Sequence, residues 1–585
     1  MQLATLDWIL ILSFFGVFLI IGLIVAKKSG KNTQEFFLSG RNMPWWLLGI
    51  SMVATTFSAD TPNLVTDIVR QHGVSGNWVW WTFLITGMLT VFVYAKLWRR
   101  SQVLTDLQFY EMRYSGKSAA FLRGFRAIYL GVFFNVMIMA SVCLAAIKIG
   151  GIMFDLEPLQ CVLYASLVTV LYSSIGGLRG VIFTDFLQFI VAMVGSVWAA
   201  YYIVNMPEIG GLQNLLAHEN VSDKLNFLPD FNDTNSLLVL LIIPIAVQWW
   251  SVWYPGAEPG GGGYIAQRML SAKDEKNAIG ATLLFNVAHY ALRPWPWIII
   301  ALASLVLYPQ LSDLGNEFPN AVLGHDLGYS AVLTNLPAGL LGLVVASLIA
   351  AFMSTISTHL NWGSSYISLD FYKRFIKPEA SEKELVTIGR ISTVILMALA
   401  ALLALALSSA LSTFAILLQI GAGTGLIFIL RWFWWRINAY SEITGMIVSF
   451  IMALFFEFTE LGLEDYEKLI YGVAITTVSW IAVTLLTRPT NTQTLANFYN
   501  AITPYGRGWN KFKAIAAKQN ILIKTTHDVF TIDLASMLLG ILCVYTSLFA
   551  TGYIIYGNIM GATILLLIAA ASAFMIFKLW KRKAT

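Results

Sequence analysis

Apolar segments long enough to cross a lipid bilayer recur along almost the whole chain. A spanning α-helix needs about 20 predominantly apolar residues, and by that measure we count about fifteen segments. They lie near residues 6–26, 45–71, 76–98, 124–154, 158–175, 178–205, 236–258, 279–308, 331–362, 386–408, 411–435, 439–458, 468–487, 532–554 and 557–580. The sequence therefore predicts an all-α membrane protein with about 15 transmembrane spans.

The composition agrees with this class and excludes several others. Hydrophobic residues make up 57% of the 585 residues and charged residues only 12%, whereas soluble domains have about 25% charged residues. The net charge of +5 gives no reason to expect a nucleic-acid partner. The three cysteines and six histidines are scattered without metal-ligand spacing, and the chain has no phosphate-binding loop. We therefore expect neither an enzyme nor an ATP-driven pump.

Basic and acidic loops alternate along the chain. The basic groups are Lys27, Lys28 and Lys31, then Lys96, Arg99 and Arg100, then Arg268, Lys273 and Lys276, and then Lys373, Arg374 and Lys377. The loops at 206–235 and 457–465 are acidic. Because cytoplasmic loops are enriched in Lys and Arg, we predict an integral plasma (inner) membrane protein with the N-terminus outside and the C-terminus cytoplasmic. The basic stretch 488–531 is expected to be a cytoplasmic loop with a surface helix.

Two stretches inside the predicted spans oppose a regular helix. Residues 54–62 are rich in hydroxyl groups and end at Pro62, and residues 254–263 contain two prolines and five glycines. The spans that hold them are five helices apart and oppositely oriented, as in an inverted repeat with broken helices. A kinked helix and a flexible loop would be simpler, but would not explain Asp60 in one stretch and Glu258 in the other, since carboxylates within a membrane are usually functional.

A third polar stretch lies in the span near 331–362. Ser354, Ser357 and Thr358 are spaced i, i+3 and i+4, so their hydroxyl groups share one helical face. Such a face suits close helix packing, and it also suits a hard cation such as sodium. Asp185, early in the sixth span, is either an ion ligand or the partner of nearby Arg179.

Several motifs together resemble the sodium/solute symporter family, which includes sodium-coupled sugar, proline and sialic-acid carriers. The resemblance covers about residues 5–460. The motifs are Phe36 to Arg41 before Trp45-Trp46, Gly176-Gly177-Leu178 with Thr184-Asp185 and Gln188, Tyr264 to Arg268 with Ala272-Lys273, and Ala351 to Thr355 followed by Asp370-Phe371-Tyr372-Lys373.

This resemblance implies a leucine-transporter-type fold with a 5+5 inverted repeat. The expected parts are an extra N-terminal helix and link at 1–40, a transport core at 41–437, and additional C-terminal helices at 438–585. The family's main sodium site maps onto Ala54, Phe57, Ala351, Ser354 and Thr355. A further sodium site of some members maps onto Asp185, Ser354, Ser357 and Thr358.

The candidate solute contacts are Thr56, Asp60, Thr61, Glu258 and Gln419. They differ from the groups that the sugar carriers have, so the resemblance does not carry over a sugar specificity. Because Asp60 and Glu258 can accept hydrogen bonds, we expect a small polar organic solute, such as a zwitterion, an amine or a polyol, rather than a simple anion. Gln419 precedes a glycine-rich segment, and helix packing explains that segment equally well. Two carboxylates in a low dielectric must be offset by a cation, by protonation of one carboxyl group, or by a basic side chain such as Arg293 or Arg70. In the last case Asp60 would be structural.

The function implied is sodium-coupled secondary active symport by alternating access, with sodium ions, a small polar solute and the lipid bilayer as partners. The alternative is a non-transporting membrane sensor on the same fold. Such sensors usually have a signalling domain, and the insert at 488–531 is too short to be one.

Overall fold

The computed structural model describes residues 3–29, 31–56, 58–252, 258–319, 321–407, 420–421, 423–459, 462–504, 506–524 and 529–584. Within these ranges the regular structure is helical, and the only β pairing is an isolated bridge between Met43 and Ala272. The predicted all-α class is therefore confirmed for the described part of the chain.

The helices follow one another with short breaks, and η marks short 3-10 or π segments. Up to the second polar stretch they are α1 Thr5–Ser29, α2 Thr33–Leu38, η1 Ser39–Arg41, α3 Trp45–Thr56, α4 Asp60–His72, η2 Val74–Asn77, α5 Trp78–Trp81, α6 Leu84–Leu89, η3 Thr90–Tyr94, α7 Ala95–Ser101, α8 Gln108–Arg113, α9 Gly116–Ile128, η4 Tyr129–Phe134, α10 Asn135–Phe154, α11 Pro158–Val204, α12 Leu212–Ala217, η5 Ser222–Lys224, α13 Thr234–Leu237, η6 Leu238–Ile242, α14 Ile243–Ala246 and η7 Gln248–Trp250. After it they are α15 Gly263–Ser271, α16 Glu275–Val287, η8 Ala288–Leu292, α17 Pro294–Leu307, α18 Leu311–Glu317, α19 Leu327–Leu333, α20 Leu340–Ser365, η9 Tyr366–Ile376, α21 Glu382–Ala404, α23 Ala439–Phe458, α24 Asp465–Leu486, α25 Thr492–Ile502, η10 Arg507–Trp509, α26 Asn510–Lys518, α27 Phe530–Ile555 and α28 Ile559–Ala584.

Ten helical segments of the described residues are long and apolar enough to cross a membrane. They are Val74–Ser101, Gly116–Phe154, Gly177–Val204, Glu275–Leu307, Leu340–Ile376, Glu382–Ala404, Ala439–Phe458, Asp465–Leu486, Phe530–Ile555 and Ile559–Lys581. Four shorter apolar helices are Thr5–Phe18, Trp45–Thr56, Pro158–Leu171 and Thr234–Ala246. Most of the predicted spans therefore have a matching helix. Part of the predicted span 411–435 lies outside the described residues.

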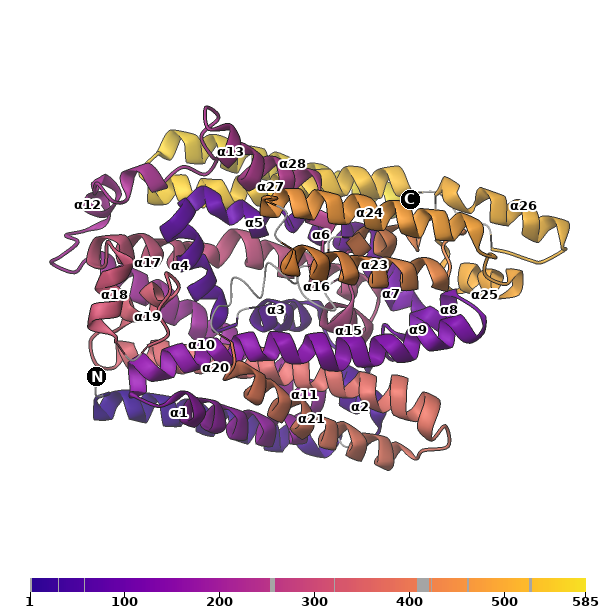
Figure 1. Cartoon of the computed structure of the whole chain (residues 1–585), viewed down its shortest axis with the longest axis horizontal. Helices are drawn as coiled ribbons and strands as arrows, with labels where there is room; N and C mark the ends of the chain where they lie inside the picture. Colours follow the sequence, from indigo (N-terminus) through magenta and orange to yellow (C-terminus); the bar gives the residue numbers. More distant parts are fainter. Residues whose placement is uncertain are drawn as a thin grey trace.

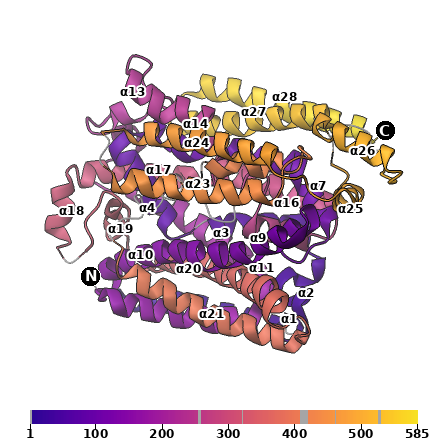
Figure 2. The ribbon, with the colours of Figure 1, turned by 45° about the vertical axis from the view of Figure 1, so that its right-hand side comes forward.

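The helices form an elongated bundle with a buried centre, and its outer helices expose apolar side chains. In Figure 1 α1 and α21 line one long side, α27 and α28 line the opposite side, and α3 lies between them; Figure 2 shows the same order from another angle. The apolar window of Leu340–Ile376 is 89% buried, whereas that of Ile559–Lys581 is only 17% buried. The helix with the predicted hydroxyl face therefore lies in the core.

The predicted spans 158–175 and 178–205 form one continuous element, α11, with a sharp kink. Gly177 at the kink has φ 55° and ψ −169°, a conformation that favours glycine. The two predicted spans are therefore two parts of one kinked element. Gly177–Val204 is long and apolar enough to cross a membrane, whereas Pro158–Leu171 is a shorter apolar helix. The predicted span 331–362 is shifted instead. Gly339, with φ 88°, precedes the start of α20 at Leu340, and the helix continues through η9 to Ile376.

The basic stretch near the C-terminal end contains two short helices rather than one. The helices α25 and α26 pack on each other through buried Tyr499, Trp509 and Phe512. Arg100 at the end of α7 donates a hydrogen bond to the Thr503 hydroxyl group, 3.0 Å away. The segment is therefore attached to the end of the helical bundle.

Candidate functional site

The first polar stretch interrupts a helix at the centre of the bundle. The helix α3 ends at Thr56 and α4 begins at Asp60, and the described residues between them, Ser58 and Ala59, are not helical; Phe57 is outside the described residues. Pro62 lies in the first turn of α4, where a missing N–H is tolerated. The break therefore precedes the proline. The hydroxyl groups of Thr56 and Thr61 satisfy carbonyl oxygens at the end of α3: Thr56 Oγ1 donates to Val53 at 2.9 Å, and Thr61 Oγ1 donates to Thr56 at 3.4 Å.

The second polar stretch is also non-helical where it is described. It separates η7, which ends at Trp250, from α15, which begins at Gly263. Gly260 and Gly261 have φ values of 88° and 82°, which other residues rarely adopt. The Asp106 carboxylate accepts the backbone N–H of Gly263 at 2.8 Å and so caps the first turn of α15. Both predicted interruptions are therefore present.

The hydroxyl face of α20 packs directly on the end of α3. Thr355 Oγ1 donates to the carbonyl oxygen of Thr55 at 2.8 Å, and Thr358 Oγ1 lies 3.1 Å from Thr55 Oγ1. Ala54 and Ala351 are also buried, one residue and one helical turn from these contacts. The fold thus brings the described residues of the predicted main sodium site, on α3 and α20, to one interface.

Asp185 on α11 contacts the same hydroxyl face of α20 through Ser354. Its Oδ1 accepts the hydroxyl group of Ser354 at 2.5 Å, and its Oδ2 accepts that of Ser51 at 2.5 Å. The alternative partner Arg179 forms an ion pair with Glu35 instead, at 3.4 Å. Pairing of Asp185 with Arg179 is therefore wrong as a structural explanation.

Ser357 contributes less to this cluster than its spacing suggests. Its hydroxyl group donates to the carbonyl oxygen of Ser354, 3.1 Å away on the same helix. Such a bond to the preceding turn occupies the donor of the serine within its own helix. Of the four predicted ligands of the second site, Asp185 and Ser354 are therefore in direct contact, and the hydroxyl group of Ser357 bonds to the backbone of Ser354.

The cation next to Asp185 is Arg268, which the pattern of loop charges placed in a cytoplasmic loop. Its side chain is fully buried, and Nη2 lies 3.6 Å from Asp185 Oδ2. Lys96 was placed in the same way and is also buried, paired with Asp533 at 2.5 Å. Both loop predictions are wrong because a buried acidic partner compensates each charge.

Asp60 is the first residue of α4, directly after the first break. Its Oδ1 is buried and has no hydrogen-bond partner among the described residues. Arg70 is not its partner, because its guanidinium donates to the carbonyl oxygens of Ser304 and Tyr308 at the end of α17, both at 2.8 Å.

Arg293 lies next to the same break. Its Nη1 donates to Thr56 Oγ1 at 3.3 Å, and its charge acts on Asp60. Thr56 Oγ1 also lies 3.1 Å from His289 Nδ1. The sequence identified Arg293 as a candidate, whereas His289 was missed because nothing in its spacing distinguishes it from a packing residue.

Glu258 in the second break is held by two arginines. Arg126 of α9 contacts its Oε1, and Arg431 donates to its Oε2 at 3.0 Å. Both arginines also lie near Glu442 of α23, at 3.4 and 3.5 Å. All four side chains are at most 3% exposed. Glu258 thus has the basic partners that a buried carboxylate needs, although neither is Arg293 or Arg70.

A small cavity adjoins Glu258 between the second break, α6 and α16. Its volume is about 40 Å³, close to the share of one water molecule in the liquid. Thr86 Oγ1 and Asn286 Oδ1 are buried at its wall without a hydrogen-bond partner among the described residues. A cavity of this size is too small for an organic solute. Gln419 lies outside the described residues.

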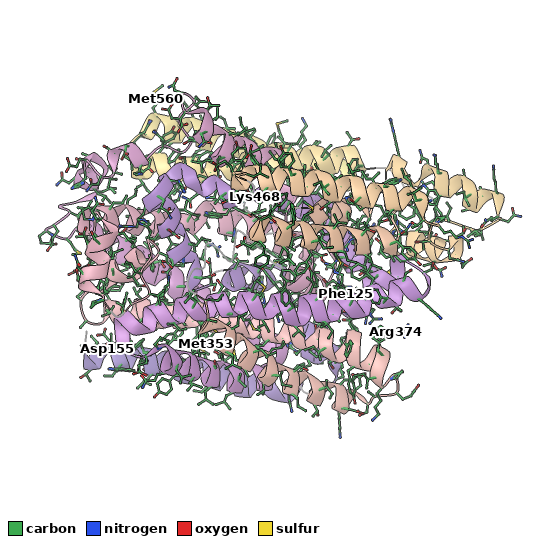
Figure 3. The ribbon with its side chains drawn as sticks, viewed as in Figure 1. Phe125, Asp155, Met353, Arg374, Lys468 and Met560 are labelled. Atoms are coloured by element: carbon green, nitrogen blue, oxygen red, sulfur yellow. The ribbon has the colours of Figure 1, made fainter. Side chains whose placement is uncertain are left out.

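Figure 3 relates these groups to the two ends of the bundle. Asp155 at the end of α10 and Arg374 in η9 lie at opposite ends, and Met353, next to the hydroxyl face of α20, lies between them. The hydroxyl face of α20 therefore lies between the two ends. Broken helices, a buried hydroxyl face and compensated buried charges are together typical of a secondary active transporter.

The comparison with known families agrees with this class. The model of the sodium:solute symporter family matches residues 36–449. The chain belongs to that family. It is a sodium-coupled symporter and an integral membrane protein, and its cargo is a small solute together with sodium.

Known relatives cover most of the chain. The sodium/glucose cotransporter of Vibrio parahaemolyticus is 26% identical and covers 84% of this chain and 92% of its own length. A sodium/sialic acid symporter of Aliivibrio fischeri is also 26% identical, over 83% of this chain and 93% of its own. A solved Na⁺-coupled sialic acid symporter has a TM-score of 0.69 with 21% identity and covers 84% of this chain and 99% of that chain. The fold is therefore that of a sodium-coupled symporter, and none of these relatives is a sensor.

Proposed function

We propose that the transported sodium ion binds between the end of α3 and the hydroxyl face of α20. The ligands are the carbonyl oxygens of Ala54, Phe57 and Ala351 and the hydroxyl groups of Ser354 and Thr355. The observation that supports this most strongly is the 2.8 Å bond from Thr355 Oγ1 to the Thr55 carbonyl oxygen. It holds a hydroxyl group against the negative end of a half-helix, where transporters coordinate sodium.

Ser354→Ala and Thr355→Ala are each expected to weaken sodium binding about tenfold or more. Each variant removes one of few ligands, a loss of about 1–3 kcal/mol. The measurement is the sodium concentration that half-saturates thermal stabilisation of the purified protein, with choline as the replacing cation. Thr393→Ala is the matched control, because this buried threonine on α21 bonds only to its own helix, at Gly389. Unchanged sodium dependence in both site variants would contradict the assignment.

We also propose a second sodium site formed by Asp185, Ser354, Ser357 and Thr358. The short bonds of Asp185 to the hydroxyl groups of Ser354 and Ser51 support an oxygen-rich position there. The Asp185 carboxylate gives this site a negatively charged ligand, which the main site lacks. Two sodium ions would then be coupled to one transport cycle.

The proposed solute contacts are Thr56, Asp60, Thr61, Glu258 and Gln419, and the solute is a small polar organic molecule. The unpaired Asp60 Oδ1 supports this, since a buried carboxylate oxygen without a donor can accept one from a solute. A zwitterion, an amine or a polyol has such a donor. Glu258 would contact the solute from the small cavity that it lines.

Asp60→Asn is expected to reduce solute-induced stabilisation while leaving sodium-induced stabilisation intact. The amide keeps the shape of the side chain but replaces one acceptor oxygen by a donor. Glucose, mannose, myo-inositol, sialic acid and amino acids form the test panel, with uptake as the second readout. A variant that binds the solute normally but melts earlier would show that Asp60 is structural and paired with Arg293.

The finer architecture is also a proposal. An inverted repeat of five plus five helices occupies 41–437, with the flanking parts 1–40 and 438–585 and about fifteen spans in total. The two breaks, one before α4 and one before α15, support it. The N-terminus lies outside and the C-terminus in the cytoplasm of a plasma (inner) membrane. The basic end near Arg374 and the acidic loop 206–235 support this orientation.

A further inference from the structure

Arg268 occupies the centre of the proposed second sodium site. Its Nη2 donates to Thr358 Oγ1 at 2.8 Å and to Thr55 Oγ1 at 3.2 Å, and lies 3.6 Å from Asp185 Oδ2. Its Nε donates to Ser51 Oγ at 3.3 Å. Both Arg268 and Asp185 are fully buried. The guanidinium therefore fills the space between the carboxylate and the hydroxyl groups of α3 and α20.

The same oxygen atoms cannot hold Arg268 and a sodium ion at one time. The lone pairs of Thr358 Oγ1 and Asp185 Oδ2 now face the guanidinium, and they would have to face the sodium ion instead. Two adjacent cations would also share a single carboxylate in a low-dielectric interior, where like charges repel strongly. Occupation by one cation therefore excludes the other.

The position of Arg268 in the fold lets it move with the second break. It belongs to α15, whose start is preceded by Gly260 and Gly261 in left-handed conformations. The other end of α15 is bonded to the chain that enters α3: Met43 N–H donates to the Ser271 carbonyl oxygen at 3.2 Å. A shift of α15 therefore changes the position of Arg268 and affects both broken helices.

We propose that Arg268 and the second sodium ion are alternative occupants of the Asp185 site. The guanidinium neutralises Asp185 when the ion is absent, and it withdraws with α15 when sodium binds. This inference rests on the proposed second sodium site and assigns to Arg268 the role of a tethered competitor. The wild-type affinity of that site for sodium is consequently lower than its ligands alone would give.

The test compares Arg268→Gln with wild type in sodium-dependent thermal stabilisation, at constant ionic strength with choline as the replacing cation. Loss of the competitor is expected to lower the half-saturating sodium concentration about tenfold. The variant should also melt earlier than wild type in choline and recover in sodium, because Asp185 then lacks its buried cation. Adding Asp185→Asn to Arg268→Gln should abolish the gain. Unchanged or weakened sodium affinity in Arg268→Gln would overturn the proposal.

Two further variants keep the test decisive if Arg268→Gln does not fold. Arg268→Lys retains the charge but cannot donate to Thr55, Thr358 and Ser51 at once, so it should raise sodium affinity by a smaller factor. Ser51→Ala removes one contact of the guanidinium and is expected to act in the same direction, and no gain in either variant would also overturn the proposal. Asp185→Asn separates the two hypotheses. If it leaves the sodium dependence of the wild type unchanged, the proposed second site is wrong, whereas a loss there with no gain at Arg268 rejects only the competitor role.

Discussion

Glu258→Gln is expected to destabilise the protein by about 3–5 kcal/mol, the usual cost of leaving a buried charge without its partner. Glu258 and Glu442 together balance Arg126 and Arg431 in a cluster that is nearly closed to solvent. Glutamine has the same shape but no charge, so one of the two arginine charges is left uncompensated. The second break would then lose its attachment to α9, and sodium-driven uptake should fall with the stability.

The measurement is the melting temperature of the purified variant together with uptake into proteoliposomes. Glu208→Gln is the matched control, since Glu208 lies exposed in the acidic loop after α11. The double variant Glu258→Gln with Arg431→Gln restores the charge balance and retains the pair of Arg126 with Glu442, which are 3.4 Å apart. It should therefore recover part of the lost stability. A single variant with wild-type melting and uptake would show that the cluster does not hold the break.

The helix breaks could be predicted from sequence because their signals are local. Glycines such as Gly260 and Gly261 have backbone conformations that few other residues adopt, and this is visible without knowing any partner. The hydroxyl face of α20 is equally local, because helical spacing alone places Ser354 and Thr358 on one side. The exact residues of the first break were harder to predict, since Pro62 suits the first turn of a helix as well as its interruption.

The partners of the charged residues could not be predicted in this way. Asp185 and Arg179 are close in sequence, but six positions along a helix turn a side chain by about 240°, so they face different neighbours. The true neighbour, Arg268, comes from a helix that begins after the second break. Rules for loop charge place such a residue in the cytoplasm, because a single sequence does not reveal the acidic group that makes its burial possible.

Gly425→Val is expected to abolish transport and to destabilise the protein by about 3 kcal/mol or more. Overpacking costs about 1–3 kcal/mol where side chains can adjust, and here the obstacle is backbone. A Cβ atom at Gly425 would overlap the carbonyl oxygen of Trp250, and one at Gly421 would overlap that of Val252. The two glycines are four residues apart and so share one helical face.

This face lets the segment that follows Gln419 approach the second break at backbone contact. Small residues serve this purpose between membrane helices, where packing rather than the hydrophobic effect holds them together. Gly423, between the two, faces Thr476 of α24 instead. The glycine-rich segment is thus explained by packing on two sides, and this explanation holds whether or not Gln419 also contacts the solute.

The experiment compares Gly425→Ala and Gly425→Val with Gly16→Ala, a position on α1 where an added Cβ meets no atom within 4 Å. Yield, melting temperature and sodium-driven uptake should fall in Gly425→Ala and fall further in Gly425→Val. Gly16→Ala should remain close to wild type. We expect the second break to move against this glycine face during transport, so Gly425→Ala should reduce uptake more than it reduces the melting temperature. Normal uptake in Gly425→Val would mean that the helix and the break are not in backbone contact.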